Sequence, residues 1–200
     1  MTKHYSRILA VLASLCLCSA AHATAYTFSA FLTGPGEATP NTSPGTGTAI
    51  VTFNDMTNLM EVNVTFQDLM GPTTASHIHA ATASPGTGAA GVATTTPTFT
   101  GFPLGVTSGT YDHTFDMTLA TSYNPAYVTA NGGTIASAEA ALLAAMLAGE
   151  SYLNIHTTSF PGGEIRGFLS VPDAAETAAL LVMGLFAMLG FARYQRVRVS

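Results

Sequence analysis

The sequence predicts an all-β domain, an antiparallel β-sandwich with one short helix, between a secretory leader and a membrane-spanning C-terminal segment. Polar and apolar residues alternate repeatedly along the middle of the 200-residue chain, which is typical of strands. Only one stretch of this middle part carries the start and stop signals of a helix. Both ends combine an apolar run with basic residues. These patterns divide the chain into a leader at 1–25, a domain at 26–170 and a tail at 171–200.

The N-terminal segment has the order of a signal peptide. Lys3 and Arg7 come first, an apolar run follows, and small residues ending in AHATA complete residues 1–25. Cys16 and Cys18 are the two cysteines of the chain, and both lie in this leader. The exported protein is therefore expected to have neither a thiol nor a disulfide.

Period-2 alternation locates the strands of the domain. Thr48–Asn54 and Leu59–Leu69 alternate in this way, and the turn-forming sequence NDMTN between them predicts a hairpin. The last two strands are joined by a predicted turn, FPGG. The predicted strands are Ala25–Thr33, Thr48–Asn54, Leu59–Leu69, Ser76–Ala80, Thr110–Ala120, Tyr152–His156 and Glu164–Ser170.

A single helix is predicted near the end of the domain. Ser137 is its expected N-cap, Glu139 lies in its first turn, and Gly149 ends the apolar stretch AALLAAMLA. Several strands with a lone helix favour an antiparallel sandwich with the layering of immunoglobulin or superoxide dismutase domains. Residues 84–109 have little pattern and are expected to hold a short edge strand and loops.

The tail contains an apolar segment followed by arginines. Ala178–Ala192 is apolar throughout, and fifteen residues of helix rise about 22 Å, somewhat less than the roughly 30 Å hydrocarbon core of a bilayer. With its flanking residues the segment is predicted to span a membrane over about 177–194. The basic residues after it predict a cytoplasmic C-terminus and a domain on the outer side.

The tripeptide Val171, Pro172 and Asp173 precedes this segment. The order of tripeptide, short apolar helix and arginine cluster resembles the PEP-CTERM sorting signal of exopolysaccharide-producing Gram-negative bacteria, in its VPD form. The resemblance implies an exosortase-type processing enzyme as a partner, with exopolysaccharide or matrix proteins as further partners. It also implies a protein that is tethered to the inner membrane before processing and is at the cell surface or extracellular afterwards.

The charge of the domain limits its partners. Within residues 26–170, Arg166 is the one basic residue against nine Asp and Glu, so one positive and nine negative charges give −8. No basic patch can neutralise phosphates, which excludes nucleic acid as a partner. Glu164 and Arg166 share a strand face and are interpreted as a structural ion pair, or Arg166 as a residue that is hydrogen-bonded to loop carbonyl groups. The alternative is a pair that binds a glycan or another substrate.

The histidines outside the leader all fall in predicted strands. In the sequence SHIHA, His77 and His79 point to the same face of a strand. Neutral imidazoles suit copper and zinc, which need three or four donors. We therefore expect a copper or zinc site formed by His77, His79 and His156, with His113 as the weakest candidate ligand. The alternative is that these histidines are polar or half-buried residues that bind no metal.

Four long segments resemble the CHRD domain, a module of many secreted bacterial proteins. They are FSAFLTGPGEATPNTSPGTGTAIVTF, LMEVNVTFQDLMGPTTASHIHAATA, SGTYDHTFDMTLA and YLNIHTTSFPGGEIRGFL. Ala80 and the sequence EATP depart from the glycine and the proline pair that the family usually has there. The resemblance implies an extracellular β-sandwich and no established enzyme activity.

The sequence thus favours a secreted or surface-anchored, non-enzymatic extracellular module with a histidine site for copper or zinc. No nucleophile motif and no diagnostic carboxylate pair is present, so no catalytic residue is predicted. Two alternatives remain: a copper- or zinc-dependent redox enzyme similar to superoxide dismutase, and an adhesion module that binds glycans or proteins. An open coordination position and redox activity would favour the enzyme.

Overall fold

In the computed structural model, which describes residues 25–172, seven strands form one continuous antiparallel sheet. The strand order across the sheet is β4-β6-β7-β1-β2-β3-β5. The strands are β1 (Ala25–Thr33), β2 (Thr46–Asn54), β3 (Leu59–Gln67), β4 (Thr73–His79), β5 (Gly109–Asp116), β6 (Tyr152–Thr157) and β7 (Ile165–Phe168). The helices of this part are a 3-10 turn (Ala120–Ser122), α1 (Pro125–Ala130) and α2 (Ile135–Leu147).

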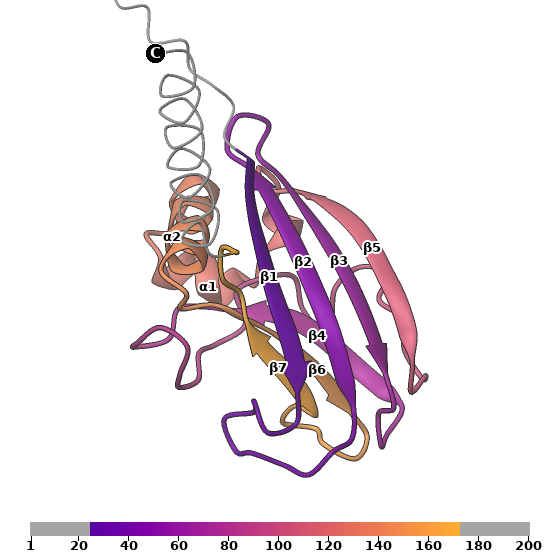
Figure 1. Ribbon diagram of the computed structural model, residues 1–200. Coiled ribbons are helices and arrows are strands. Elements are labelled where there is room, and N and C mark those ends of the chain that lie inside the picture. Colours follow the sequence, from indigo (N-terminus) through magenta and orange to yellow (C-terminus); the bar gives the residue numbers. More distant parts are fainter. Residues whose placement is uncertain (1–24, 173–200) are drawn as a thin grey trace, which may run out of the picture.

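The sheet curls so strongly that it resembles half of a barrel. β1, β2, β3 and β5 form one wall, and β4, β6 and β7 cross behind it (Figure 1). The predicted antiparallel β-rich fold is confirmed, but its two layers are two halves of one sheet. The link is the pairing of β1 with β7, in which Thr33 lies opposite Arg166. Alternation shows which face of a strand is buried, and it contains no information about this pairing.

The core lies inside the curl and is closed by the helices. Along β1, β2 and β3, buried and exposed residues alternate, so each strand has one dry and one wet face. α2 covers the core with its buried residues Ala138, Leu142 and Met146. Each large side chain buried in this way stabilises the fold by roughly 1.5–3 kcal/mol.

Both predicted strand connections are confirmed. β2 and β3 pair along their whole lengths, and the Asn54 side chain accepts hydrogen bonds from the backbone N–H groups of Met56 and Thr57 in the turn. Asn58 completes the turn with a φ of 53°, a conformation that asparagine tolerates better than most residues. β6 and β7 pair around the FPGG turn.

The helices differ from the prediction in two respects. The N-cap of α2 is Thr134, and the predicted cap Ser137 is the third residue of the helix, where it completes a capping box with Thr134. α1 was not predicted, because six residues are too few to show a helical period. It begins with an Asn124 cap and Pro125. Residues 84–109 form isolated bridges in place of the expected edge strand.

The two predicted terminal segments lie outside the described residues, apart from Ala25 at the start of β1 and Val171 and Pro172 of the tripeptide. Asp173 and the predicted membrane span at about 177–194 are not described. Within residues 25–172, no helix is long and apolar enough to cross a membrane. The signal peptide, the sorting signal and the span therefore stay predictions.

Candidate metal site

The half of the sheet formed by β4, β6 and β7 carries different chemistry on its two faces. Ile78, Leu153 and Ile155 are fully buried in the hydrophobic core. Because successive side chains of a strand alternate, their neighbours point to the opposite face. Strand pairing brings these neighbours together as a polar layer, which consists of His77, His79, Tyr152, Asn154, His156, Arg166 and Phe168.

This polar layer is covered by loops and is not an open sheet face. The carbonyl groups of Ala90 and Pro97 lie against its histidines, and those of Gly36 and Gly88 lie against its arginine. As a result His77 is only 7% and His79 only 8% exposed. Histidines on a solvated face would need no partner, whereas buried ones must have their nitrogens satisfied.

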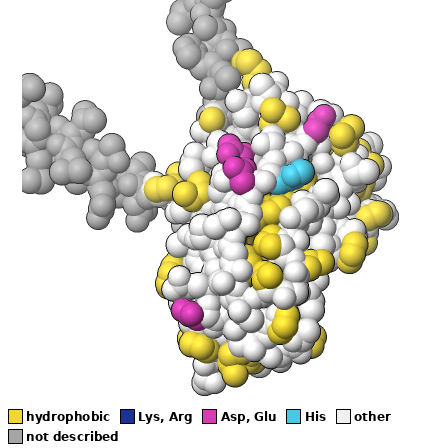
Figure 2. Space-filling model, turned by 90° about the vertical axis from the view of Figure 1, so that its right-hand side faces the viewer, with side chains coloured by type: hydrophobic (Ala, Val, Ile, Leu, Met, Phe, Trp, Pro, Cys, Tyr) yellow, Lys and Arg dark blue, Asp and Glu magenta, His cyan; other side chains and the backbone are white. Residues whose placement is uncertain are grey.

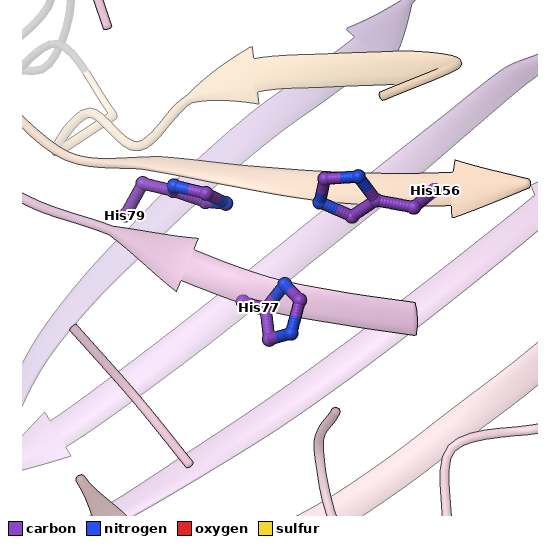
Figure 3. Close-up of side chains that lie close together, drawn as sticks. All are labelled: His77, His79 and His156. Carbon is purple, nitrogen blue, oxygen red and sulfur yellow. The ribbon is translucent and has the colours of Figure 1, made fainter. Parts of the chain in front are cut away.

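Three histidines of the polar layer face one another, two from β4 and one from β6 (Figure 3). The ring centroids of His77 and His79 are 5.7 Å apart, those of His77 and His156 5.3 Å, and those of His79 and His156 6.0 Å. One ligand nitrogen from each ring lies within 4.8 Å of the other two. Nitrogens bound to one zinc ion are about 3.4 Å apart, so binding would draw the nitrogens of each pair together by up to about 1.4 Å.

A backbone carbonyl holds one nitrogen of each ring. His77 Nε2 lies 2.5 Å from Pro97 O, His79 Nδ1 lies 2.9 Å from Ala90 O, and His156 Nδ1 lies 2.9 Å from Pro161 O. A carbonyl oxygen can only accept a hydrogen bond, so in each neutral ring the held nitrogen carries the proton. The other nitrogen of each ring keeps its lone pair.

These three remaining nitrogens have no hydrogen-bond partner within residues 25–172. They are Nδ1 of His77, Nε2 of His79 and Nε2 of His156, and all three are buried. An unsatisfied buried polar atom costs about 1–3 kcal/mol, and a single metal ion would satisfy all three at once. Metal-binding histidines in general donate their second N–H to a carbonyl or carboxylate, as these do.

Burial also keeps the three rings in the form that binds metal. It lowers the pKa of His79 to about 4, with smaller contributions from the charges of His77, His156 and Arg166, against the hydrogen bond to Ala90. Burial lowers the pKa of His77 and of His156 as well. Each imidazole is therefore neutral at pH 7, and a neutral imidazole is the species that binds a metal ion.

His113 is not brought into this cluster. It lies on β5, the strand at the opposite edge of the sheet from β4. Its ring contacts those of Tyr111 and Phe115, with centroids 6.1 and 4.6 Å away. The group that could hold a metal ion among the described residues consists of the other three histidines.

Glu164 and Arg166 have separate partners, so the predicted ion pair is corrected in favour of the other interpretation, in which Arg166 donates to loop carbonyl groups, here those of Gly36 and Gly88. The Glu164 carboxylate is fully buried and accepts hydrogen bonds from the side chains of Ser43 and Thr157 and from two backbone N–H groups. Arg166 Nε lies 3.9 Å from Oε2 of Glu37. The two residues are two positions apart, but Glu164 precedes β7 and its carboxylate is held by the loop before β2.

Glu37 and Asn154 are polar residues of this region that sequence reasoning missed. Glu37 Oε1 and Asn154 Oδ1 are buried without a partner among the described residues. Burial raises the pKa of Glu37 to about 7 against the opposing charge of Arg166. Gly163 makes room for both, because a Cβ there would lie 2.7 Å from each of these oxygens. The isolated acid in GPGEATP was the only sequence signal for Glu37.

Comparison with known proteins identifies the family. A family model described as the CHRD domain matches residues 28–169, a stretch that includes all seven strands in whole or in part and all three clustered histidines. No curated protein and no solved structure matches the chain. The family model covers more than two thirds of the sequence, and the chain therefore belongs to the CHRD domain family.

Proposed function

We propose that this protein is an exported, non-enzymatic module that binds one copper or zinc ion through His77, His79 and His156. The observation that supports the proposal most strongly is that three buried ring nitrogens without a partner belong to three histidines whose ligand atoms lie within 4.8 Å of one another. Three carbonyl groups hold the rings with those nitrogens free. A purely structural role would account for the three hydrogen bonds to carbonyl groups, but not for three buried nitrogens without a partner in one cluster.

The donor set determines the class of metal. All three donors are imidazole nitrogens, which suit copper and zinc, whereas calcium and magnesium require oxygen ligands. The charge of the domain also favours a cation. Arg166 is the one Lys or Arg of the described part and is only 4% exposed, so the carboxyl groups on the surface there have no exposed Lys or Arg beside them. On the face shown in Figure 2, no lysine or arginine is visible.

A second candidate is a metalloenzyme. Three protein ligands leave at least one coordination position for water or a substrate, which distinguishes catalytic from closed structural zinc sites. If the copper-loaded chain consumes superoxide and the His79→Ala variant does not, the metalloenzyme replaces the non-enzymatic module as the proposed function.

The location of the protein is part of the proposal. Ser170 still pairs with Ser29 of β1, and Val171 directly after it is 47% exposed. The Val-Pro-Asp tripeptide thus begins where the domain ends, which supports access by an exosortase-type enzyme. Release of a truncated form from cells that contain such an enzyme, and its loss on Pro172→Ala, would test this.

The outer face of the sheet supports contact with a neutral matrix polysaccharide. Thr48, Thr65 and Thr110 lie in register across β2, β3 and β5, and Phe31 of β1, next in the same row, is 64% exposed. Hydroxyl groups beside an exposed aromatic ring are suited to uncharged sugars. Pull-down of the chain by insoluble polysaccharide, compared with that of Phe31→Ala, tests this partner.

The metal proposal is tested by metal content. The exported full chain, purified without chelator and incubated with copper or zinc, is expected to retain one ion per chain in mass spectrometry. The double variant His77→Ala/His79→Ala is expected to retain none. His113→Ala is the matched control, because it removes a histidine outside the cluster. Metal-free wild-type protein after both incubations would overturn the proposal.

A further inference from the structure

A stack of three planar groups lies behind the proposed ligand His79. Its ring is parallel to that of Tyr152, with centroids 4.7 Å apart and planes inclined by 6°. The guanidinium carbon of Arg166 lies 4.6 Å from the centroid of the same tyrosine ring. His79 and Tyr152 are directly opposite each other in the pairing of β4 with β6. The stack is therefore built into the strand register.

The tyrosine hydroxyl and the histidine share one backbone residue. Ala90 O accepts hydrogen bonds from His79 Nδ1 at 2.9 Å and from the Tyr152 hydroxyl at 3.2 Å. The N–H group of Ala90 donates to the same hydroxyl at 3.2 Å. Tyr152 therefore contacts the face of the histidine ring and also holds the carbonyl group that determines its tautomer.

Arg166, the third member of the stack, is itself held in place by its hydrogen bonds. Arg166 donates to Gly36 O at 2.5 Å and to Gly88 O at 2.8 Å, and it is paired with the buried carboxylate of Glu37. A cation over an aromatic face is attracted to the ring, most strongly where water is excluded. The fixed guanidinium thus restrains the tyrosine ring, and the tyrosine ring restrains the histidine.

We propose that Tyr152 is a positioning residue for the metal site, which fixes the orientation and the tautomer of His79. This inference rests on the metal-binding function proposed above. With Tyr152 in place, Nδ1 of His79 carries the proton and Nε2 is left without a partner, on a ring whose centroid lies 5.7 and 6.0 Å from those of His77 and His156. Without it, the ring can turn and the carbonyl group that holds the proton is free to move. Loss of such supporting contacts typically lowers metal affinity 10–100-fold.

Two variants distinguish the contribution of the Tyr152 ring to metal binding from that of its hydroxyl group. Tyr152→Leu removes the stack and the hydrogen bonds, and Tyr152→Phe keeps the stack and removes only the bonds to Ala90. The matched control is Tyr123→Phe, which also removes a buried tyrosine hydroxyl from a backbone carbonyl, that of Met117, but lies outside the polar layer. Metal dissociation constants are measured for the exported full chain by competition with a chelator, under conditions where circular dichroism shows folded protein.

We expect Tyr152→Leu to weaken metal binding 10–100-fold, Tyr152→Phe to weaken it less, and Tyr123→Phe to leave it unchanged. A role in overall stability alone would not produce this order among folded proteins. Wild-type affinity in both Tyr152 variants would overturn the inference while leaving the metal site intact. If Tyr152→Leu does not fold, Tyr152→Phe decides, because it retains the ring.

A second measurement needs no metal. ¹⁵N NMR of the metal-free chain reports which nitrogen of His79 carries the proton, and we expect only the Nδ1–H form in the wild type. Tyr152→Leu is expected to show a mixture of both tautomers. If wild-type protein binds no metal, the proposed function fails, and the tautomers still decide whether Tyr152 positions the ring. An unchanged tautomer in Tyr152→Leu would contradict the inference.

Discussion

Replacing Glu164 by glutamine should destabilise the domain more than a change of a single atom suggests. Oε1 of Glu164 accepts hydrogen bonds from Ser43 Oγ (2.6 Å) and Met70 N (2.5 Å). Oε2 accepts from Thr157 Oγ1 (2.5 Å) and Gly71 N (3.3 Å). These contacts connect β6 and β7 with the loops before β2 and β4. Four donors use the full capacity of a carboxylate, and none of them finds an acceptor in the NH₂ group of glutamine.

The size of the effect follows from these contacts. In either orientation the amide nitrogen of glutamine faces one hydroxyl and one backbone N–H group. The hydroxyl can rotate and accept, but the N–H of Met70 or Gly71 is left without an acceptor. A lost hydrogen bond to a charged group contributes about 1.5–3 kcal/mol, and a stranded buried donor costs about 1–3 kcal/mol. We therefore expect the free energy of unfolding to fall by roughly 2–4 kcal/mol.

Urea denaturation of the metal-free chain measures this change as a lower midpoint at an unchanged slope. The melting temperature should fall by roughly 5–15 °C for a domain of this size. Glu61→Gln is the control, because Glu61 is exposed and, among the described residues, its carboxylate accepts a hydrogen bond from the side chain of Asn63. This change should alter stability by less than about 0.5 kcal/mol. A Glu164→Gln variant as stable as Glu61→Gln would refute the reasoning.

Four further predictions concern the polar layer, two residues packed against it, and His113 at the far edge of the sheet. The pKa of His79 is lowered to about 4, so the unfolded chain binds more protons between pH 6.5 and 4, and the stability of the metal-free chain should fall as the pH falls through this range in urea titrations. Glu37 has its pKa raised to about 7, so between pH 4.5 and 7 the folded chain binds more protons than the unfolded chain, and this adds stability as the pH falls. Glu37→Gln removes that contribution, so the stability should fall more steeply with falling pH; a shallower fall would contradict this assignment. Gly163→Ala places a Cβ 2.6–2.7 Å from buried polar atoms at a φ of +127°, and it should lower the free energy of unfolding in denaturant by more than about 2 kcal/mol. Gly162 has open space around it, so Gly162→Ala should lower it far less. Equal losses of stability in the two variants would contradict this packing. His113→Ala should leave metal affinity unchanged in chelator competition, and a loss of affinity would place that residue at the site.

The part of the fold set by local alternation was predictable. The predicted β1 has the observed bounds, and β2 and β3 begin or end within two residues of theirs, because each buries every second side chain. The continuous sheet was not predictable, since it depends on β7 and the residues after it joining β1, through the Ser29–Ser170 bridge and the pair of Thr33 and Arg166. These pairs connect distant parts of the chain, and residue alternation contains no long-range information.

The candidate metal site was also predictable only in part. His77 and His79 share a face because of the strand period alone, which the sequence displays. The addition of His156 depends on the pairing of β4 with β6 and could only be hypothesised. His113 lies in an equally regular strand and differs only in lying at the far edge of the sheet. Glu37 was missed because the curl of the sheet, and no local pattern, brings the first loop to β7.

The most direct test of the metal site is X-ray absorption at the metal edge of the zinc- or copper-loaded, exported full chain. The structure predicts a first shell with three imidazole rings at about 2.0–2.1 Å, and one fewer ring in the His79→Ala variant. A shell that contains only oxygen ligands, or one that is unchanged in the variant, would show that the ion binds elsewhere. It would contradict the assignment of His77, His79 and His156 as its ligands.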